Sequence, residues 1–231
     1  AINPDNFLCN VIKDVKTEFP ELVVIADIAL DPYTSSGHDG ILKGGYIDND
    51  LTLNALSEMS INLADVGTDI LAPSDMMDGR IGVIRDRLEE KEYKDVILIS
   101  YAVKYASNYY GPFRDAVGST NDNGISKDSY QMDYRNFKEA HKEVQLDIEE
   151  GADIVMVKPA LSNLDIINSI SKSYDVPVFS YQVSGEYSML KHGIDKKLFD
   201  SNVIPETLMS IFRAGSNSIL TYFAKLMAEN K

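Results

Sequence analysis

The stretch Gly151-Ala152-Asp153-Ile154-Val155-Met156-Val157-Lys158 is typical of a chain that leaves a helix and enters a buried parallel strand. A glycine after a helical segment accommodates the left-handed conformation that ends many helices. A continuous apolar run is typical of strands that are covered on both faces. The same order, a glycine and then an apolar run, occurs at residues 67–71 and 215–220. This weak repeat predicts alternating helices and parallel strands.

Six apolar runs are predicted as strands, at residues 22–30, 69–73, 96–101, 154–157, 176–183 and 218–222. The segments between them carry apolar residues three or four positions apart, which predicts amphipathic helices. The predicted buried faces contain Leu56, Met59, Leu63 and Val66 in one helix, Phe137, Ala140, Val144 and Ile148 in another, and Leu208, Ile211 and Phe212 in a third, with Pro205 in its first turn.

Chains with this alternation form either an open doubly wound sheet or a closed (β/α)8 barrel. The sequence lacks the G-x-G-x-x-G and P-loop motifs with which open sheets bind nucleotides. Polar residues instead follow one strand after another, and in a barrel the chemistry lies at the carboxyl ends of many strands. We therefore predict one TIM-barrel domain over residues 1–231. A closed barrel has about eight strands, so we expect the first two βα units to lie before residue 1.

Charge and composition exclude several classes of protein. The 231 residues include 22 basic and 36 acidic ones, and the formal net charge of −14 disfavours a nucleic-acid surface. Hydrophobic residues make up 44% of the chain, enough for a globular core, while no apolar run is long enough to span a membrane. The single cysteine, Cys9, excludes a disulfide framework and a cysteine-built zinc site.

Two lysines follow apolar strands, Lys158 and Lys104. Burial disfavours the charged ammonium, so the pKa falls and the free amine can attack a ketone. A second cation nearby lowers the pKa further. The pair predicts Schiff-base chemistry. The alternative is that each lysine extends to solvent or pairs with a carboxylate.

Three aspartates and a histidine occur in and after the first strand, namely Asp27, Asp31, His38 and Asp39. Carboxylate oxygens are hard ligands that suit Mg²⁺ better than zinc. The alternative is turn chemistry, because Asp31-Pro32 and the His-Asp-Gly sequence also favour turns.

A third group of polar residues follows the strands. In Tyr109-Tyr110-Gly111-Pro112-Phe113-Arg114-Asp115, the aromatic rings and Arg114 are suited to enclose a small carboxylate. The alternative is a packed loop in which Arg114 pairs with Asp115. Ser74 and Asp75 either line a pocket or accept hydrogen bonds from the first turn of a helix.

Together these motifs closely resemble the porphobilinogen synthase (5-aminolevulinate dehydratase) family. The resemblance runs in motif order from about residue 3 to the carboxyl terminus. It rests on Asp27, on Asp39-Gly40 and on residues 72–80, 109–115, 156–159 and 181–187. The family implies a (β/α)8 barrel with an N-terminal arm, which we expect to precede residue 1, and a homo-octamer.

The resemblance implies that two molecules of 5-aminolevulinate condense to porphobilinogen with loss of two waters. Lys158 resembles the Schiff-base lysine for the substrate that supplies the propionate side, and Ser184 and Tyr222 would hold the carboxylate of that substrate. Lys104 resembles the lysine for the substrate that supplies the acetate side. The other implied residues are Arg114, Lys127 and Gln131 at the second carboxylate, Asp27 in proton transfer, and Ser74 and Asp75 in the pocket.

The resemblance also implies Mg²⁺. Zinc-dependent members carry cysteines where this chain has Ala29, Asp31 and Asp39, so the chain resembles the magnesium-type branch. Asp31 and Asp39 are implied as active-site ligands or water-mediated partners, and Glu143 as a ligand of an allosteric Mg²⁺ at a subunit interface. One departure is Tyr134, where the family usually has proline. The branch occurs in plants, apicomplexan plastids and some bacteria, so we expect the cytoplasm or a plastid stroma.

Two other functions stay open. A class I aldolase-type lyase on the same fold would need only one Schiff-base lysine. An inactive interaction module is the other alternative, since an incomplete barrel exposes its edges.

Overall fold

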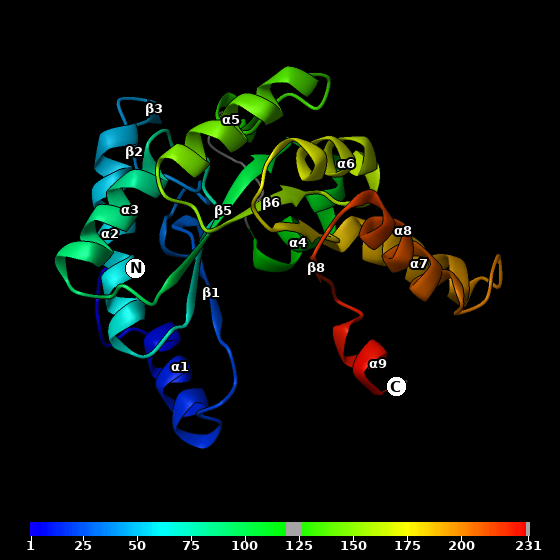
Figure 1. Ribbon diagram of the computed structural model, residues 1–231, viewed down its shortest axis with the longest axis horizontal. Coiled ribbons are helices and arrows are strands. Elements are labelled where there is room, and N and C mark those ends of the chain that lie inside the picture. The colour runs from blue at the N-terminus through cyan, green and yellow to red at the C-terminus, as the bar shows by residue number, and fades with distance from the viewer. Residues whose placement is uncertain (119–125, 230–231) are drawn as a thin grey trace. The chain divides into compact units, whose positions relative to one another are not determined.

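The computed structural model of the protein describes residues 1–118 and 126–229. Strands and helices alternate along the chain (Figure 1). Hydrogen bonds order the strands β1-β4-β5-β6-β7-β8 in one six-stranded sheet. The pairs β1 with β4, β4 with β5, β6 with β7 and β7 with β8 are parallel. The predicted class, alternating α/β with a parallel sheet, is therefore confirmed.

The six predicted strands are all present, with shorter bounds in most cases. They are β1 (Ile25–Ile28), β4 (Ile70–Pro73), β5 (Ile97–Lys104), β6 (Ile154–Lys158), β7 (Val178–Tyr181) and β8 (Ser218–Leu220). The helices are α1 (Phe7–Glu18), α2 (Asn49–Asp65), α3 (Arg80–Glu90), α4 (Gly111–Val117), α5 (Phe137–Glu149), α6 (Leu164–Ser173), α7 (Ser184–Asp195), α8 (Val203–Ala214) and α9 (Ala224–Glu229). Short 3-10 turns are η1 (Asp31–Tyr33), η2 (Asn108–Tyr110), η3 (Lys127–Ser129) and η4 (Leu161–Asn163).

The repeated glycines end helices as predicted. Gly67, Gly151 and Gly215 follow α2, α5 and α8, and their φ angles are 91°, 102° and 122°. These positive values are strained for residues with a Cβ and accessible to glycine. The repeat thus marks three equivalent passages from a helix into a strand.

A small hairpin was not predicted. Strands β2 (Leu42–Lys43) and β3 (Tyr46–Ile47) pair in antiparallel fashion. Gly44 and Gly45 connect them with φ angles of 62° and 88°, and positive values at both central residues are what a tight hairpin turn requires.

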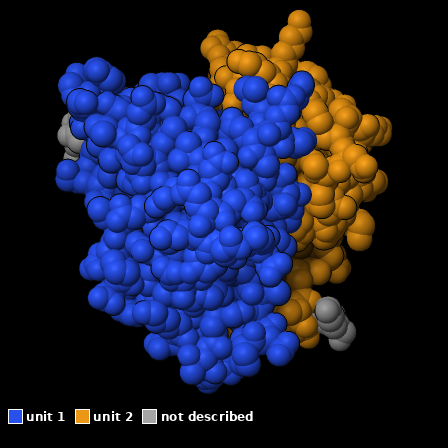
Figure 2. Space-filling view, turned by 60° about the vertical axis from the view of Figure 1, so that its left-hand side comes forward, with its two compact units in different colours: residues 1–101, 121–130, 145–154 blue, residues 102–120, 131–144, 155–231 orange. Residues whose placement is uncertain are grey.

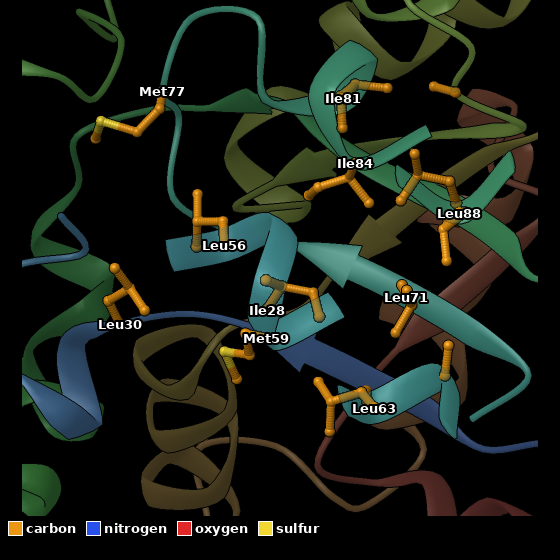
Figure 3. Packing of buried hydrophobic residues seen from close by; sticks show 14 of the residues in the cluster. Ile28, Leu30, Leu56, Met59, Leu63, Leu71, Met77, Ile81, Ile84 and Leu88 are labelled. Carbon is orange, nitrogen blue, oxygen red and sulfur yellow. The ribbon is translucent and has the colours of Figure 1, made fainter. Parts of the chain in front are cut away.

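The chain divides into two compact units, shown in different colours in Figure 2: residues 1–101, 121–130 and 145–154 form one, and residues 102–120, 131–144 and 155–231 form the other. In the first unit, the predicted stripe Leu56, Met59 and Leu63 packs with side chains of β1, β4 and α3 (Figure 3). Each is at most 1% exposed, and full burial of such a side chain contributes about 1.5–3 kcal/mol.

In the second unit, α7 and α8 share a cluster that contains Leu190, Ile204, Leu208 and Phe223. The predicted burial of Phe212 is wrong, because this side chain is 43% exposed. Ile211 is fully buried at the centre of the inward face of α8, and the next residue points about 100° further round the helix.

The predicted burial of Phe137 is also wrong. Phe137 is the first residue of α5 and is 45% exposed, whereas Ala140 and Val144 of the same stripe are fully buried. Its ring contacts that of His141, with the ring centroids 5.3 Å apart.

Within the described residues, no helix has the length and apolarity needed to cross a membrane.

Candidate active site

The two predicted lysines belong to the second unit, and each ends one of two adjacent strands. Lys104 is the last residue of β5 and Lys158 the last residue of β6. The Tyr105 N–H donates to the Lys158 carbonyl over 3.0 Å, which places the two strand ends side by side. Lys104 is 6% exposed and Lys158 is partly buried. The predicted juxtaposition at the carboxyl ends of neighbouring strands is therefore present.

Aromatic rings surround the amine of Lys158. The Nζ atom lies 4.6 Å from the ring centroid of Tyr181, the last residue of β7, and 5.3 Å from that of Tyr110. The Tyr110 hydroxyl donates to the carbonyl oxygens of Tyr105 and Lys158, at 2.8 and 3.3 Å. Ring faces attract positive charge, so the two rings are placed to stabilise positive charge that develops at this partly buried Nζ.

Gln131 lies next to Lys104. The Met132 N–H donates to the Lys104 carbonyl at 3.1 Å, and the Ala106 N–H donates to the Met132 carbonyl at 2.8 Å. Gln131 is 6% exposed, and its Oε1 has no hydrogen-bond partner among the described residues. Buried polar atoms normally have partners, so this amide is a candidate for contact with a ligand.

The segment that carries Arg114 is fastened to the start of α7. The Arg114 guanidinium lies 5.3 Å from the centroid of the Tyr110 ring, the same ring that Lys158 contacts. The Ser184 Oγ accepts from the Phe113 N–H at 3.1 Å and donates to the Tyr109 carbonyl at 3.3 Å. Ser184 and Arg114, which were predicted to bind the carboxylates of different substrate molecules, are thus held in neighbouring segments.

Tyr222 is the most exposed of the predicted substrate contacts in this unit. It follows β8 and is 48% exposed. Its ring lies against that of Tyr187 in α7, with the centroids 5.3 Å apart. The ring contact ties Tyr222 to the helix that begins with Ser184.

Gly185 permits the close approach of α7 to η2, and Gly185→Ala is expected to destabilise the protein. A Cβ at this position would lie 2.5 Å from the Tyr109 carbonyl oxygen and 2.7 Å from its Cα. Backbone atoms cannot move aside like a flexible side chain, so we expect a loss of about 1–3 kcal/mol in the free energy of unfolding. Urea denaturation measures it. Gly111→Ala is the control, because no heavy atom lies within 4 Å of its added Cβ; equal losses in both variants would contradict the clash.

Two of the predicted polar residues of the first unit form a buried ion pair. The Lys127 Nζ donates to the Asp39 Oδ1 at 2.7 Å, and the two residues are 6% and 3% exposed. The Tyr130 hydroxyl accepts from the Asp39 N–H at 3.3 Å and contacts the His38 Nδ1 at 3.1 Å. Lys127, predicted at a substrate carboxylate, and Asp39, predicted at a metal, are therefore partners of each other here.

Asp31 is the first residue of η1 and is partly buried. The 3-10 turn that starts there shows that turn chemistry accounts for part of this loop. Glu143 lies in α5 and is also partly buried.

Asp27, Ser74 and Asp75 lie in and after neighbouring strands of the first unit. Asp27 of β1 is exposed and stands opposite Ala72 of β4. Ser74 and Asp75 follow β4 and are buried. Asp75 Oδ1 accepts from the Met77 N–H at 2.7 Å, and α3 begins only at Arg80, without a side-chain cap. The alternative that Ser74 and Asp75 cap a helix is therefore wrong.

A buried arginine was missed by the sequence analysis. Arg80 is 2% exposed, and its NH2 group donates to the Ser100 Oγ and the Tyr101 carbonyl, each at 3.2 Å. The guanidinium also lies 3.5 Å from an oxygen of Asp147 and 3.8 Å from one of Asp75. Arg80 thus connects Asp75, a predicted pocket residue, with Asp147 of α5. A short sequence motif cannot predict this contact, because Asp147 is 67 positions away from Arg80.

Comparison with known proteins identifies the family. Residues 1–230 match the family model described as Delta-aminolevulinic acid dehydratase. The curated enzyme of that name from Bradyrhizobium diazoefficiens is 46% identical over 99% of this chain and 65% of its own length. The one from Methanothermus sociabilis is 50% identical over 99% of this chain and 71% of its own length.

Solved structures share the fold of this chain. The crystal structure of the Toxoplasma gondii ME49 enzyme in complex with porphobilinogen has a TM-score of 0.97 and 44% identity, covering 99% of this chain and 66% of that one. The carboxyl transferase domain of Rhizobium etli pyruvate carboxylase, at 13% identity, a TM-score of 0.53 and coverage of 92% of this chain and 29% of that one, shares the fold only.

The chain spans about two thirds of the length of the first relatives it matches, and 52% of the chloroplastic enzyme of Arabidopsis thaliana. The family match nevertheless covers this chain almost from end to end, at 44–50% identity to individual relatives. The chain therefore belongs to the delta-aminolevulinic acid dehydratase family.

Proposed function

We propose that this chain supplies the Schiff-base lysines of a porphobilinogen synthase, which condenses two molecules of 5-aminolevulinate to porphobilinogen with loss of two waters. The observation that carries the proposal is the pair Lys104 and Lys158 at adjacent strand ends. An aldolase-type lyase needs one such lysine, whereas joining two ketone substrates gives a role to both. Family membership and the product-bound Toxoplasma gondii relative support the same reaction.

In this proposal each lysine amine attacks a substrate ketone to form a carbinolamine, which loses water to give an imine. The protonated imine withdraws electrons, so that the neighbouring carbon can lose a proton near neutral pH. Lys158 takes the substrate for the propionate side and Lys104 the one for the acetate side. The ring faces of Tyr110 and Tyr181 stabilise the positive charge of the imine on Lys158.

We assign the substrate carboxylates to cationic, amide and hydroxyl groups beside the lysines. Arg114 lies on the Tyr110 ring, Gln131 stands next to Lys104, and Ser184 begins α7, where the helix dipole favours an anion. Fixed contacts of this kind orient both reactants and lower the entropic cost of joining them. The remaining assignments are Tyr222 and Lys127 at the carboxylates, Asp27 in proton transfer, and Ser74 and Asp75 in the pocket.

Mg²⁺ is proposed from the chemistry of the donors. Asp31 offers a hard oxygen ligand for an active-site Mg²⁺ and Glu143 one for a separate, allosteric Mg²⁺ at a subunit interface, since Mg²⁺ commonly binds through one or two carboxylates and several waters. Asp39 does not fit a directly bound metal, because Lys127 already neutralises its carboxylate. The described residues also contain no group of three or more His, Cys, Asp or Glu side chains suited to a metal. We therefore derive no catalytic step through a metal.

We further propose that the six strands belong to an eight-stranded barrel and that the protein forms homo-oligomers. The greater length of the relatives and the count of six parallel strands support the barrel; a sheet that stays open in an experimental structure would contradict it. The expected homo-oligomer is an octamer, and light scattering on the purified protein measures its mass.

For the location, we propose the cytoplasm or a plastid stroma, the latter supported by relatives described as chloroplastic.

Borohydride trapping tests the reaction. Purified protein is incubated with 5-aminolevulinate, reduced and mapped by peptide mass spectrometry, while porphobilinogen is assayed in parallel. We expect adducts at both Lys158 and Lys104 together with product. Adducts at neither lysine would overturn the proposal, and an adduct at Lys158 alone without porphobilinogen would favour the aldolase-type alternative. Repeating the assay after chelation, with Mg²⁺ restored, tests the metal.

A further inference from the structure

A buried glutamate in α7 has no role in the reaction described so far. Glu186 is 1% exposed, and both of its carboxylate oxygens accept backbone hydrogen bonds. The Oε1 atom accepts from the Leu161 N–H and the Oε2 atom from the Val183 N–H, each at 2.5 Å. Burial raises the pKa of Glu186, and these hydrogen bonds oppose the rise.

One of these hydrogen bonds serves the helix itself. Glu186 is the third residue of α7, and a glutamate there commonly accepts from the N-cap residue, here Val183. The second hydrogen bond does not belong to the helix. Leu161 starts η4, three residues after Lys158. A carboxylate that only capped the start of the helix would need one acceptor oxygen, whereas the second oxygen of Glu186 binds the segment that follows Lys158.

Other side chains and strand ends also hold the backbone around Lys158. The Lys158 carbonyl accepts from Tyr105 and Tyr110. The Ala160 N–H donates to the Tyr181 carbonyl at 2.9 Å, and Asn163 Nδ2 donates to the Pro159 carbonyl at 2.8 Å. The Glu186 carboxylate adds a further contact, because it binds both the Leu161 N–H and the Val183 N–H. Ser184, the next residue, binds the segment that carries Arg114.

We propose that Glu186 is a positioning residue for Lys158. Its carboxylate fixes the segment after β6 against the start of α7, so that the lysine amine stays over the rings of Tyr110 and Tyr181. The inference rests on the proposed function, in which Lys158 forms an imine. A misplacement of about 1 Å at a reacting group can cost on the order of 10²-fold in rate, so a residue that sets this position has a measurable effect.

The test compares the two lysines within one sample. Glu186→Gln keeps the shape but turns one acceptor oxygen into an NH₂ group that faces an N–H donor. After borohydride trapping with 5-aminolevulinate, we expect the ratio of Lys158 to Lys104 adduct to fall about 10- to 100-fold, with kcat reduced more than KM is changed. The internal ratio corrects for any loss of folded protein. Glu186→Asp, which keeps the charge but shortens its reach, is the second variant if the first does not fold.

Glu150→Gln is the matched control. The Glu150 Oε2 accepts from the Gly82 N–H at 3.1 Å, and burial raises the pKa of Glu150 as it does that of Glu186. The ratio of Lys158 to Lys104 adduct in Glu150→Gln should equal that of the unmodified protein. If both adducts fall in proportion in Glu186→Gln, the residue is only structural and the inference is overturned. If the unmodified protein is trapped at neither lysine, the proposed function itself fails, and this inference with it.

Discussion

Lys158→Met is expected to lower the rate of porphobilinogen formation by at least about 10³-fold, the scale on which loss of a nucleophile acts in enzymes that use one. Methionine is an unbranched, flexible side chain only one atom shorter than lysine and suits the space beside the aromatic rings of Tyr110 and Tyr181, but it cannot form an imine. We therefore expect the free energy of unfolding to change much less than kcat. Steady-state kinetics and urea denaturation on the same preparation separate the two effects.

Two further lysine variants sharpen this result. Lys172→Met is the control, because Lys172 is exposed near the end of α6, where its Nζ donates to the Asn168 Oδ1 one helical turn away; the rate of this variant should equal that of the unmodified protein. Lys104→Met should also prevent product formation while Lys158 is still trapped by borohydride. A Lys158→Met variant that retains more than a tenth of the rate would show that Lys158 is not the nucleophile.

The strands and the placement of the two lysines could be predicted because their signals are local. Runs such as Ile154–Lys158 are apolar without interruption up to the final lysine, and the glycines that precede them need a positive φ. A parallel sheet brings the carboxyl ends of its strands to one edge, so a lysine at the end of each of two successive strands predicts a pair. The structure confirms that placement.

The hairpin Leu42–Lys43 with Tyr46–Ile47 escaped prediction because strands of two residues are too short to show alternation. The residues of both strands are also largely exposed, as in a loop, so burial gives no strand pattern. The signal that was present is the dipeptide Gly44-Gly45, which favours a tight turn between short strands.

Long-range ion pairs are the part of the site that sequence patterns do not specify. Asp39 and Lys127 are 88 positions apart, and the resemblance assigned one to a metal and the other to a substrate. Only packing brings the ammonium to the carboxylate. The same holds for Arg80, whose partners Ser100 and Asp147 are 20 and 67 positions away.

Arg80→Met is expected to lower the free energy of unfolding by about 3–5 kcal/mol, the usual cost of removing one partner from a buried ion pair. The substitution leaves the carboxylates of Asp75 and Asp147, which are 0% and 3% exposed, without the guanidinium. It also removes hydrogen bonds to the Ser100 hydroxyl and the Tyr101 carbonyl. Urea denaturation measures the loss, and Arg87→Met, at an exposed pair with Glu90, is the control with a change near zero.

A second substitution separates the charge effect from the packing effect. When Arg80→Met is combined with Asp147→Asn, one of the two carboxylate charges is gone, and the new amide still reaches the Ser100 hydroxyl that Asp147 contacts. If buried charge is the main cost, the double variant is more stable than Arg80→Met alone, and the two substitutions are strongly coupled. Additive losses would instead assign the role of Arg80 to packing. A coupled result would mean that the guanidinium holds the Ser74–Asp75 segment mainly by neutralising the carboxylates around it.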